Sequence, residues 1–131
     1  MEPLKKDEVA ALMAKALKTQ EPVTFRDRPC FLKPLTYQDD LILTSIVQDV
    51  CVEAVAAGVD QNVLNRVASM STVLGLVKIA LFDGETGLNV FPTMADINTA
   101  TKENLKEYMQ IQKLYDVYMA ALELTKSEKK R

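Results

Sequence analysis

The sequence predicts a mainly α fold, a small single-domain helical bundle of about four helices with one short N-terminal β-hairpin. Apolar residues recur at helical spacing through several long stretches, whereas one stretch near the N-terminus has the short apolar runs and turn residues of a hairpin. The composition is 48% hydrophobic with only four Gly and five Pro. At 131 residues, the chain most simply forms one domain that buries about two thirds of its unfolded surface.

We expect three segments along the chain. Residues 1–20 form an N-terminal amphipathic helix, which either lies on the core or serves as an arm for a partner. Residues 21–125 form a helical core domain with the β-hairpin at 23–33, and residues 126–131 are a basic tail.

The first expected helix spans residues 4–18, because Pro3 suits the first helical position and Asp7 and Glu8 favour the N-terminal turns. One apolar stripe follows helical spacing: Val9, Leu12, Met13, Ala16 and Leu17. Charged residues interrupt this stretch, which excludes a signal peptide. The longest apolar run anywhere is shorter than the roughly 18 residues that span a bilayer. We therefore expect a soluble, cytoplasmic protein with no membrane partner.

A short hairpin is expected next, with strands at 23–25 and 30–33 joined by a turn at 26–29. A lone hairpin is only marginally stable in water. We therefore expect it either to pack on a helix or to accept the strand of a partner at its open edge.

A long helix is expected from Tyr37 to Ala57. Thr36 and Asp39 form a capping pattern at its start, and Gly58 ends it. One face carries Leu43, Ile46, Val47, Val50 and Ala54, while Leu41, Cys51, Val52 and Val55 lie outside that face. A helix that is apolar on more than one side is typically buried on more than one side, so we expect this helix to be the central element.

Asp60 is expected to cap a second long helix over residues 61–82. Its apolar residues keep heptad spacing: Val63, Val67, Met70, Leu74, Val77 and Leu81. Packing against the 37–57 helix is favoured over a coiled coil with another chain, and Gly75 suggests a close helix crossing. The end of this segment could instead be a strand that returns through a turn at 83–87.

Residues 83–101 are expected to be irregular, with a turn at 83–87 and one helical turn near 94–98. The last helix is expected from about Thr101 to Leu124. Its apolar stripe contains Tyr108, Ile111, Tyr115, Tyr118 and Leu122, with Leu105, Met109 and Met119 beside it. Tyrosines suit a partner-binding surface and equally a helix edge packed on the core with its hydroxyls in water, and both interpretations stay open.

Catalytic chemistry is not indicated by any pattern in the chain. There is no histidine, no Walker loop and no glycine-rich dinucleotide motif, and Asp39 and Asp40 fit the first turn of a helix. Cys30 and Cys51 are expected to be free, buried thiols, which favours a reducing compartment. We therefore predict no enzyme activity, no catalytic residue, no cofactor and no metal. A net charge of −2 gives no field that attracts nucleic acid.

The stretch FRDRPCFLKPLTYQDDLIL resembles the tail assembly chaperones of long-tailed bacteriophages and their prophage relatives. In that family a short hairpin ends in an x-Pro-Leu-Thr turn and an acidic-started helix follows, as at residues 34–40 here. The resemblance in layout covers about residues 22–124, and the helix at 4–18 has no counterpart. It implies a non-enzymatic protein of the host cytoplasm that binds the tape measure protein and helps tail tube subunits to polymerise around it.

An exposed helix face and a strand edge would be the working surfaces of such a protein. The residues predicted to contact a partner are Tyr108, Ile111, Tyr115 and Tyr118, followed by Phe25 and Phe31. The same surfaces allow self-association. Two alternatives stay open: a structural component of a tail or baseplate that is retained in the particle, and a small helical protein–protein adaptor unrelated to phage.

Overall fold

The computed structural model describes residues 20–129, with side chains to Leu122. This part of the chain is mainly helical, and it confirms the predicted bundle of four helices with a short N-terminal hairpin. The expected helix at 4–18 lies outside the described residues, as do the last two residues of the tail. The elements are β1 (Glu21–Phe25), β2 (Arg28–Leu32), α2 (Tyr37–Ala56), α3 (Gln61–Ala80), β3 (Leu81–Asp83), α4 (Met94–Glu103) and α5 (Leu105–Lys129).

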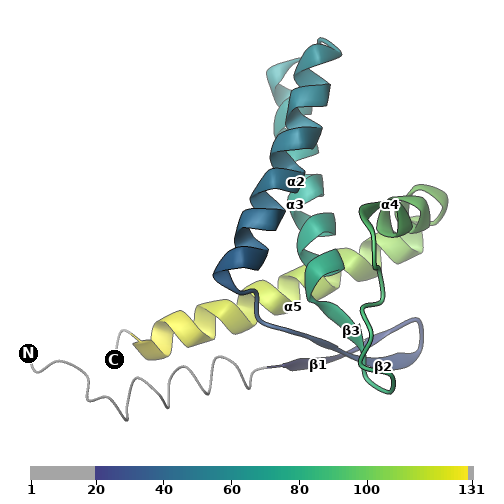
Figure 1. Cartoon of the computed structure of the whole chain (residues 1–131), viewed down its shortest axis with the longest axis vertical. Helices are drawn as coiled ribbons and strands as arrows, with labels where there is room; N and C mark the ends of the chain where they lie inside the picture. Colours follow the sequence, from purple (N-terminus) through teal and green to yellow (C-terminus); the bar gives the residue numbers. More distant parts are fainter. Residues whose placement is uncertain (1–19, 130–131) are drawn as a thin grey trace, which may run out of the picture.

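Helices α2 and α3 form an antiparallel hairpin that stands upright on a base built from the sheet, α4 and α5 (Figure 1). The long helix α5 crosses the foot of this hairpin, and α4 lies beside the lower half of α3. The tip of the hairpin, around residues 57–60, is far from the base. The fold therefore consists of a packed base and a projecting two-helix arm.

The β-hairpin turns through two residues, where the sequence suggested four. Arg26 and Asp27 both have positive φ, 54° and 59°, as a two-residue type I′ turn requires. Arg28 and Pro29 therefore belong to β2, which pairs with β1 in antiparallel register from Glu21 opposite Leu32 to Phe25 opposite Arg28. A tight turn of this kind matches the twist of the two strands.

A third strand, β3, completes a sheet of order β1-β2-β3. Helix α3 ends at Ala80, and residues 81–83 continue as a strand beside β2. The predicted helix over residues 61–82 is therefore correct up to Ala80, and the alternative prediction of a strand holds for its last residues. The return segment contributes only a single bridge, between Phe82 and Asn89. Pairing with β2 ends the helix here, because the Lys33 amide donates to the Ala80 carbonyl at 2.9 Å.

The residues that cap the helices of the projecting arm are those predicted from the sequence. The Thr36 hydroxyl accepts from the Asp39 amide, and the Asp39 carboxylate accepts from the Thr36 amide, which confirms the predicted capping box of α2. At the other end Gly58 has φ of 80°, and its amide and that of the next residue donate to carbonyls in the last turn. Asp60 then caps α3 by accepting from the Val63 amide at 2.9 Å.

Helix α3, not α2, is the central element, so the prediction that α2 is buried on more than one side is wrong. Leu43 is the single fully buried residue of α2, whereas α3 buries Ser71, Val73, Leu74, Gly75, Leu76, Val77 and Ala80. The physical reason is that the C-terminal half of α3 enters the base and contacts α4 and α5. Helix α2 packs mainly along α3 and leaves its outer side in solvent.

Gly75 confirms the predicted close crossing of the two helices. A Cβ at this position would lie 2.6 Å from Leu43 Cδ1 and 3.6 Å from Ile46 Cγ2. The heptad residues of α3 differ in burial. Leu74 and Val77 are buried in the base, whereas Met70, nearer the tip of the arm, is 43% exposed. Intramolecular packing therefore accounts fully for the lower heptad residues, whereas Val63 and Met70 higher on α3 remain exposed.

The core lies where α3, α4, α5 and the inner face of the sheet meet. Its fully buried large side chains are Phe25, Leu32, Val77, Leu81, Phe91, Ile97 and Ile111. Phe25 and Phe91 meet edge to face with ring centroids 5.7 Å apart. Because the core gathers residues from every element of the base, the base is the stable part of the molecule.

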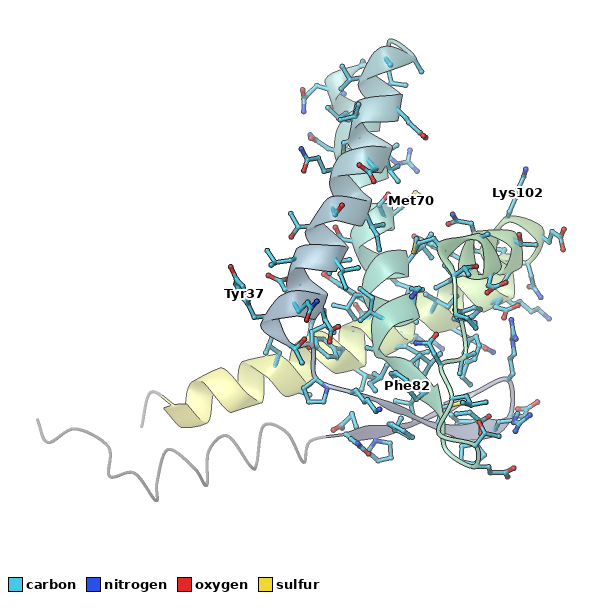
Figure 2. All side chains as sticks on the ribbon, viewed as in Figure 1. Tyr37, Met70, Phe82 and Lys102 are labelled. Carbon is cyan, nitrogen blue, oxygen red and sulfur yellow. The ribbon has the colours of Figure 1, made fainter. Side chains whose placement is uncertain are left out.

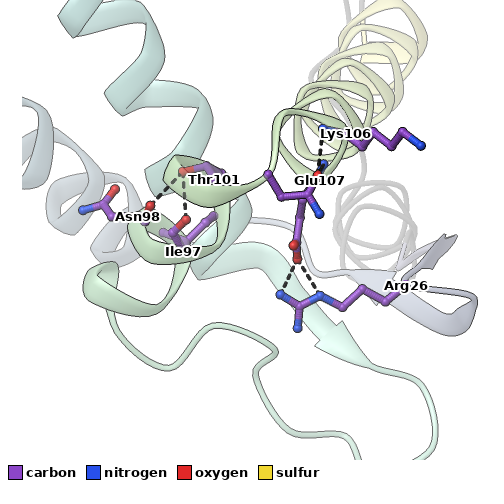
Figure 3. Close-up of polar contacts among 7 residues, drawn as sticks. Arg26, Ile97, Asn98, Thr101, Lys106 and Glu107 are labelled. Carbon is purple, nitrogen blue, oxygen red and sulfur yellow. Dashed lines mark hydrogen bonds and ion pairs between the residues drawn. The ribbon is translucent and has the colours of Figure 1, made fainter.

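Two short-range predictions about the second half of the chain need correction. Residues 94–103 form the ten-residue helix α4, where one helical turn was expected, because Thr93 and Asp96 make a second capping box. The last helix begins at Leu105, four residues after the predicted start. Its N-terminal amides at Lys106 and Glu107 donate to the Asn104 side chain, which separates the two helices (Figure 3).

Among the described residues, one helix, α3, is long and apolar enough to cross a membrane by length and composition. Only part of its apolar stretch is buried within this fold. A core helix meets the same two criteria, so this feature of α3 is weak evidence for a membrane span.

Candidate partner-binding groove between α3 and α5

The tyrosine stripe of α5 divides into buried and half-buried residues. Ile111 is 0% exposed and packs in the core, so its side chain stabilises the monomer. Tyr118 is half-buried, and its hydroxyl accepts a hydrogen bond from the Leu35 amide at 2.9 Å. Tyr108 and Tyr115 are half-buried against the core and face α3. Two of the four predicted residues of α5 therefore lie on an accessible surface between the helices.

Tyr118 ties the last helix to the segment that leads into α2. Burial raises the pKa of its hydroxyl above the ordinary value, and the nearby carboxylates of Asp39 and Asp40 act in the same direction. The hydrogen bond from the Leu35 amide opposes this rise. The phenol therefore stays protonated at neutral pH and serves as a structural hydrogen-bond acceptor.

The two predicted hairpin residues lie on opposite faces of the sheet. Phe25 is 2% exposed and belongs to the core, so a partner does not reach it unless the fold opens. Phe31 is half-buried on the outer face, where its ring stacks on Phe82 with centroids 5.8 Å apart. The Lys33 ammonium lies 4.1 Å from the centroid of the Phe82 ring. Phe31 therefore remains a candidate contact residue, within a small aromatic patch.

A groove lies in the angle between α3 and α5. It consists of two adjoining hollows of about 340 Å³ each, which share Ser69, Met70 and Tyr108. Met70 projects from α3 on the side that faces α4 (Figure 2). The complete lining is Asn65, Arg66, Ser69, Met70, Thr72 and Val73 from α3, with Tyr108, Gln112 and Tyr115 from α5. The two half-buried tyrosines that the sequence singled out are thus part of one continuous surface.

The lining of this groove suits protein contact more than catalysis. Met70 and the two tyrosine rings offer adaptable apolar area, and Met and Tyr are enriched at protein interfaces. The Thr72 hydroxyl already donates to the Ala68 carbonyl at 2.8 Å. No carboxylate or thiol lines either hollow, and Arg66 is the one charged side chain there. The groove therefore lacks the paired groups that general acid–base or nucleophilic chemistry needs.

A separate hollow of about 300 Å³ lies at the turn end of the sheet, and its charged side chains form ion pairs within the fold. The Arg26 guanidinium contacts the Glu107 carboxylate of α5 (Figure 3). Arg28 pairs with Asp83 at 3.0 Å. Burial, followed by the charge of Asp83, raises the pKa of the Cys30 thiol, which keeps it protonated. These contacts attach the hairpin to α5 and give this hollow a structural role.

The described residues hold no group of three or more His, Cys, Asp or Glu side chains placed to bind a metal ion. Cys30 and Cys51 are both free cysteines, as predicted, with Cys30 buried and Cys51 partly exposed on α2.

The outer side of α2 is an exposed apolar surface that sequence reasoning placed in the core. We call it the outer stripe, and it consists of Tyr37, Leu41, Thr44, Gln48, Val52 and Val55. Its four larger apolar side chains are between 51% and 79% exposed. Tyr37 points away from the rest of the fold at the foot of α2 (Figure 2). The sequence signal for this surface was the second apolar side of α2.

The described residues form a small helical protein with a groove of mixed polarity between α3 and α5 and an exposed, largely apolar face on α2. Comparisons with models of protein families, with curated proteins and with solved structures found no match.

Proposed function

We propose that this chain is a non-enzymatic tail assembly chaperone of a long-tailed phage or prophage, which binds an amphipathic helix of the tape measure protein. The observation that carries the binding role is the groove between α3 and α5, with Met70, Tyr108 and Tyr115 in its lining. The resemblance in layout over residues 22–124 supports the phage assignment, with promotion of tail tube assembly as the biological outcome.

The dimensions of the groove fit two turns of a helix. Along α3 the lining runs from Asn65 to Val73, which is about 12 Å at 1.5 Å per residue. A bound helix would place two or three side chains at i, i+3 or i+4, and i+7 over this distance. Each hollow has the volume for one large apolar anchor. The groove thus suits the apolar stripe of a long helical protein.

Charge further specifies the partner. Arg66 lies at the upper end of the groove, and no acidic side chain lines it. The preferred helix therefore carries apolar anchors and an acidic residue near the end that meets Arg66. Binding of this kind shields apolar residues of the partner from aggregation until tube subunits cover them.

The first test is whether a long, tape-measure-like gene lies beside the gene for this chain, and the second is co-expression of this chain with that protein. The wild-type chain is expected to keep that protein soluble and to bind its isolated helices. Met70→Asp should weaken binding at least tenfold, because it places a charge in the groove. Leu88→Asp is the matched control, since Leu88 is 69% exposed and lies outside the groove. Equal binding by wild type and Met70→Asp would remove the groove as the binding site.

Mass spectrometry of purified particles separates the chaperone from its structural alternative. A chaperone is expected to be missing from finished particles, whereas a tail or baseplate component is present in fixed stoichiometry. Detection of this chain at stoichiometric level would replace the chaperone proposal with the structural one.

A further inference from the structure

The upper part of the projecting arm has no buried core of its own. We call residues 44–70 the distal arm, which comprises the upper parts of α2 and α3 and the tip between them. Within the described fold no residue of the distal arm is buried, whereas Leu43 just before it and Ser71 just after it are. Burial of apolar surface is the main stabilising term in folding. The distal arm therefore holds together only through two half-buried helix faces.

The polar contacts of the described residues are divided in the same way. The ion pairs all lie in the base, around the turn end of the sheet. Hydrogen bonds between distant parts of the chain also lie in the base, such as the one from the Leu35 amide to the Tyr118 hydroxyl. The side-chain hydrogen bonds of the distal arm are local, as between Gln61 and Asn65 at 2.9 Å. Within the described residues, no ion pair or long-range hydrogen bond thus connects the distal arm to the base.

The sequence of the distal arm makes its helices depend on each other. Valine recurs along both of them: Val47, Val50, Val52 and Val55 in α2, with Val63 and Val67 in α3. A β-branched side chain loses rotamer freedom in a helix, so valine is a weaker helix former than alanine or leucine. Helices in proteins are stabilised mostly by tertiary packing. Loss of the contact between the two helices should therefore unfold both upper parts together.

The close crossing at Gly75 sets the lower boundary of this unit. A Cβ at this position would lie 2.6 Å from Leu43 Cδ1, so the two helices are in tight contact at the foot of the arm. Below the crossing α3 enters the base and contacts α4 and α5. Above it the two helices project away from the base (Figure 1). The distal arm can therefore unfold while the foot of the arm stays packed.

The groove between α3 and α5 lies across this boundary. Four residues of its lining belong to the distal arm: Asn65, Arg66, Ser69 and Met70. The other lining residues belong to the base: Thr72, Val73, Tyr108, Gln112 and Tyr115. Met70 stands on the side of the arm that faces α4 (Figure 2). Unfolding of the distal arm would remove the α3 wall of the upper hollow and leave the tyrosines on the base.

We propose that the distal arm opens as one cooperative unit while the base stays folded, and that this opening takes the groove apart. The closed arm is the form that binds a helix, and the opening equilibrium sets the fraction of chains with a formed groove. A helix bound in the groove would contact both the distal arm and the base, and it would hold the arm closed. This consequence for binding rests on the proposed function, whereas the opening itself requires no partner.

Amide hydrogen exchange of the full chain, followed residue by residue by NMR, tests the opening without a partner. The helical amides of residues 47–56 and 65–70 are expected to share one opening constant, at least about tenfold larger than that of residues 73–80. Exchange that slows smoothly from the tip to the foot would indicate fraying and overturn the cooperative unit. Amides of residues 65–70 that exchange as slowly as those of residues 73–80 would overturn the disassembly of the groove.

Two matched glycine substitutions distinguish independent opening from unfolding of the whole chain. Gln48→Gly in the distal arm and Gln110→Gly in α5 make the same change at exposed positions within helices. Each should raise the opening constant of the unit that contains it about fivefold. Gln110→Gly should speed exchange in the base alone, because the base is still folded when the distal arm opens. Gln48→Gly should speed exchange in both parts, because the distal arm is also open in the fully unfolded chain.

The decisive result is the exchange of the distal arm in Gln110→Gly. If this substitution speeds exchange of residues 47–56 and 65–70 as much as that of the base, the arm opens only with the whole chain and the independent unit is overturned. The exchange pattern of the wild-type chain decides the same point if either variant fails to fold. Because no partner is present, these outcomes are separate from the binding test of the chaperone assignment.

Discussion

Gly75 gives the sharpest test of how the projecting arm is packed. In an exposed helix, replacing Gly by Ala stabilises by about 1 kcal/mol, because Gly has more backbone entropy to lose. At Gly75 the added Cβ would lie 2.6 Å from Leu43 Cδ1, more than 1 Å inside an ordinary carbon–carbon contact of about 3.8 Å. Leu43 is buried, so it can yield only by changing rotamer or by displacing α2.

The two effects oppose each other, and their sizes predict the sign. Overpacking of a core costs about 1–3 kcal/mol. Gly75→Ala should therefore change the free energy of unfolding by between about zero and 2 kcal/mol in the destabilising direction. In a Leu43→Ala background the obstructing methyl group is gone, and the same substitution should stabilise by about 1 kcal/mol. The expected coupling between the two positions is thus about 1–3 kcal/mol.

Urea unfolding of the four proteins, followed by circular dichroism, measures this coupling. Leu43→Ala itself should cost about 2–5 kcal/mol, and Leu43→Val, which also lacks a Cδ atom, is the gentler alternative. Unchanged m-values would show that the unfolded states are comparable. If Gly75→Ala stabilises wild type and Leu43→Ala by the same amount, the close crossing of α2 and α3 is refuted.

Two further predictions concern single polar contacts. Tyr118→Phe removes the acceptor of the half-buried Leu35 amide and should lower the free energy of unfolding by about 1–3 kcal/mol. Tyr37→Phe, at an exposed site, is the control and should leave the free energy of unfolding unchanged. Equal effects of the two substitutions in urea titrations would contradict this hydrogen bond. The pKa of Asp83 is lowered, first by hydrogen bonds from the Thr86 and Glu85 amides, so the unfolded state binds more protons between the folded pKa and about 3.9. Its stabilisation should therefore be present above about pH 4 and lost as pH falls through the folded pKa. Asp83→Asn should flatten the acid limb of stability against pH, and an unchanged limb would contradict this assignment.

Local chemistry allowed the sequence to determine the element boundaries in the first half of the chain. The Thr36–Asp39 capping box, the Asp60 cap and the left-handed Gly58 depend on atoms within a few residues of each other. Gly75 was recognisable because a glycine within a helix usually has a packing reason. Within this half of the chain, the local prediction that failed is the Arg26–Asp27 turn, where two residues other than glycine take positive φ.

Tertiary structure alone decided which apolar faces are buried. Helix α2 has two apolar sides, and periodicity does not say which side meets another element or whether both do. The fold places α3 in the base, leaves the outer stripe of α2 in solvent and buries Ile111 while Tyr108 and Tyr115 line a groove. Spacing along a helix specifies which residues share a side. Burial depends on how distant parts of the chain are brought together, and that is why the sequence predicted the tyrosine face but not the groove.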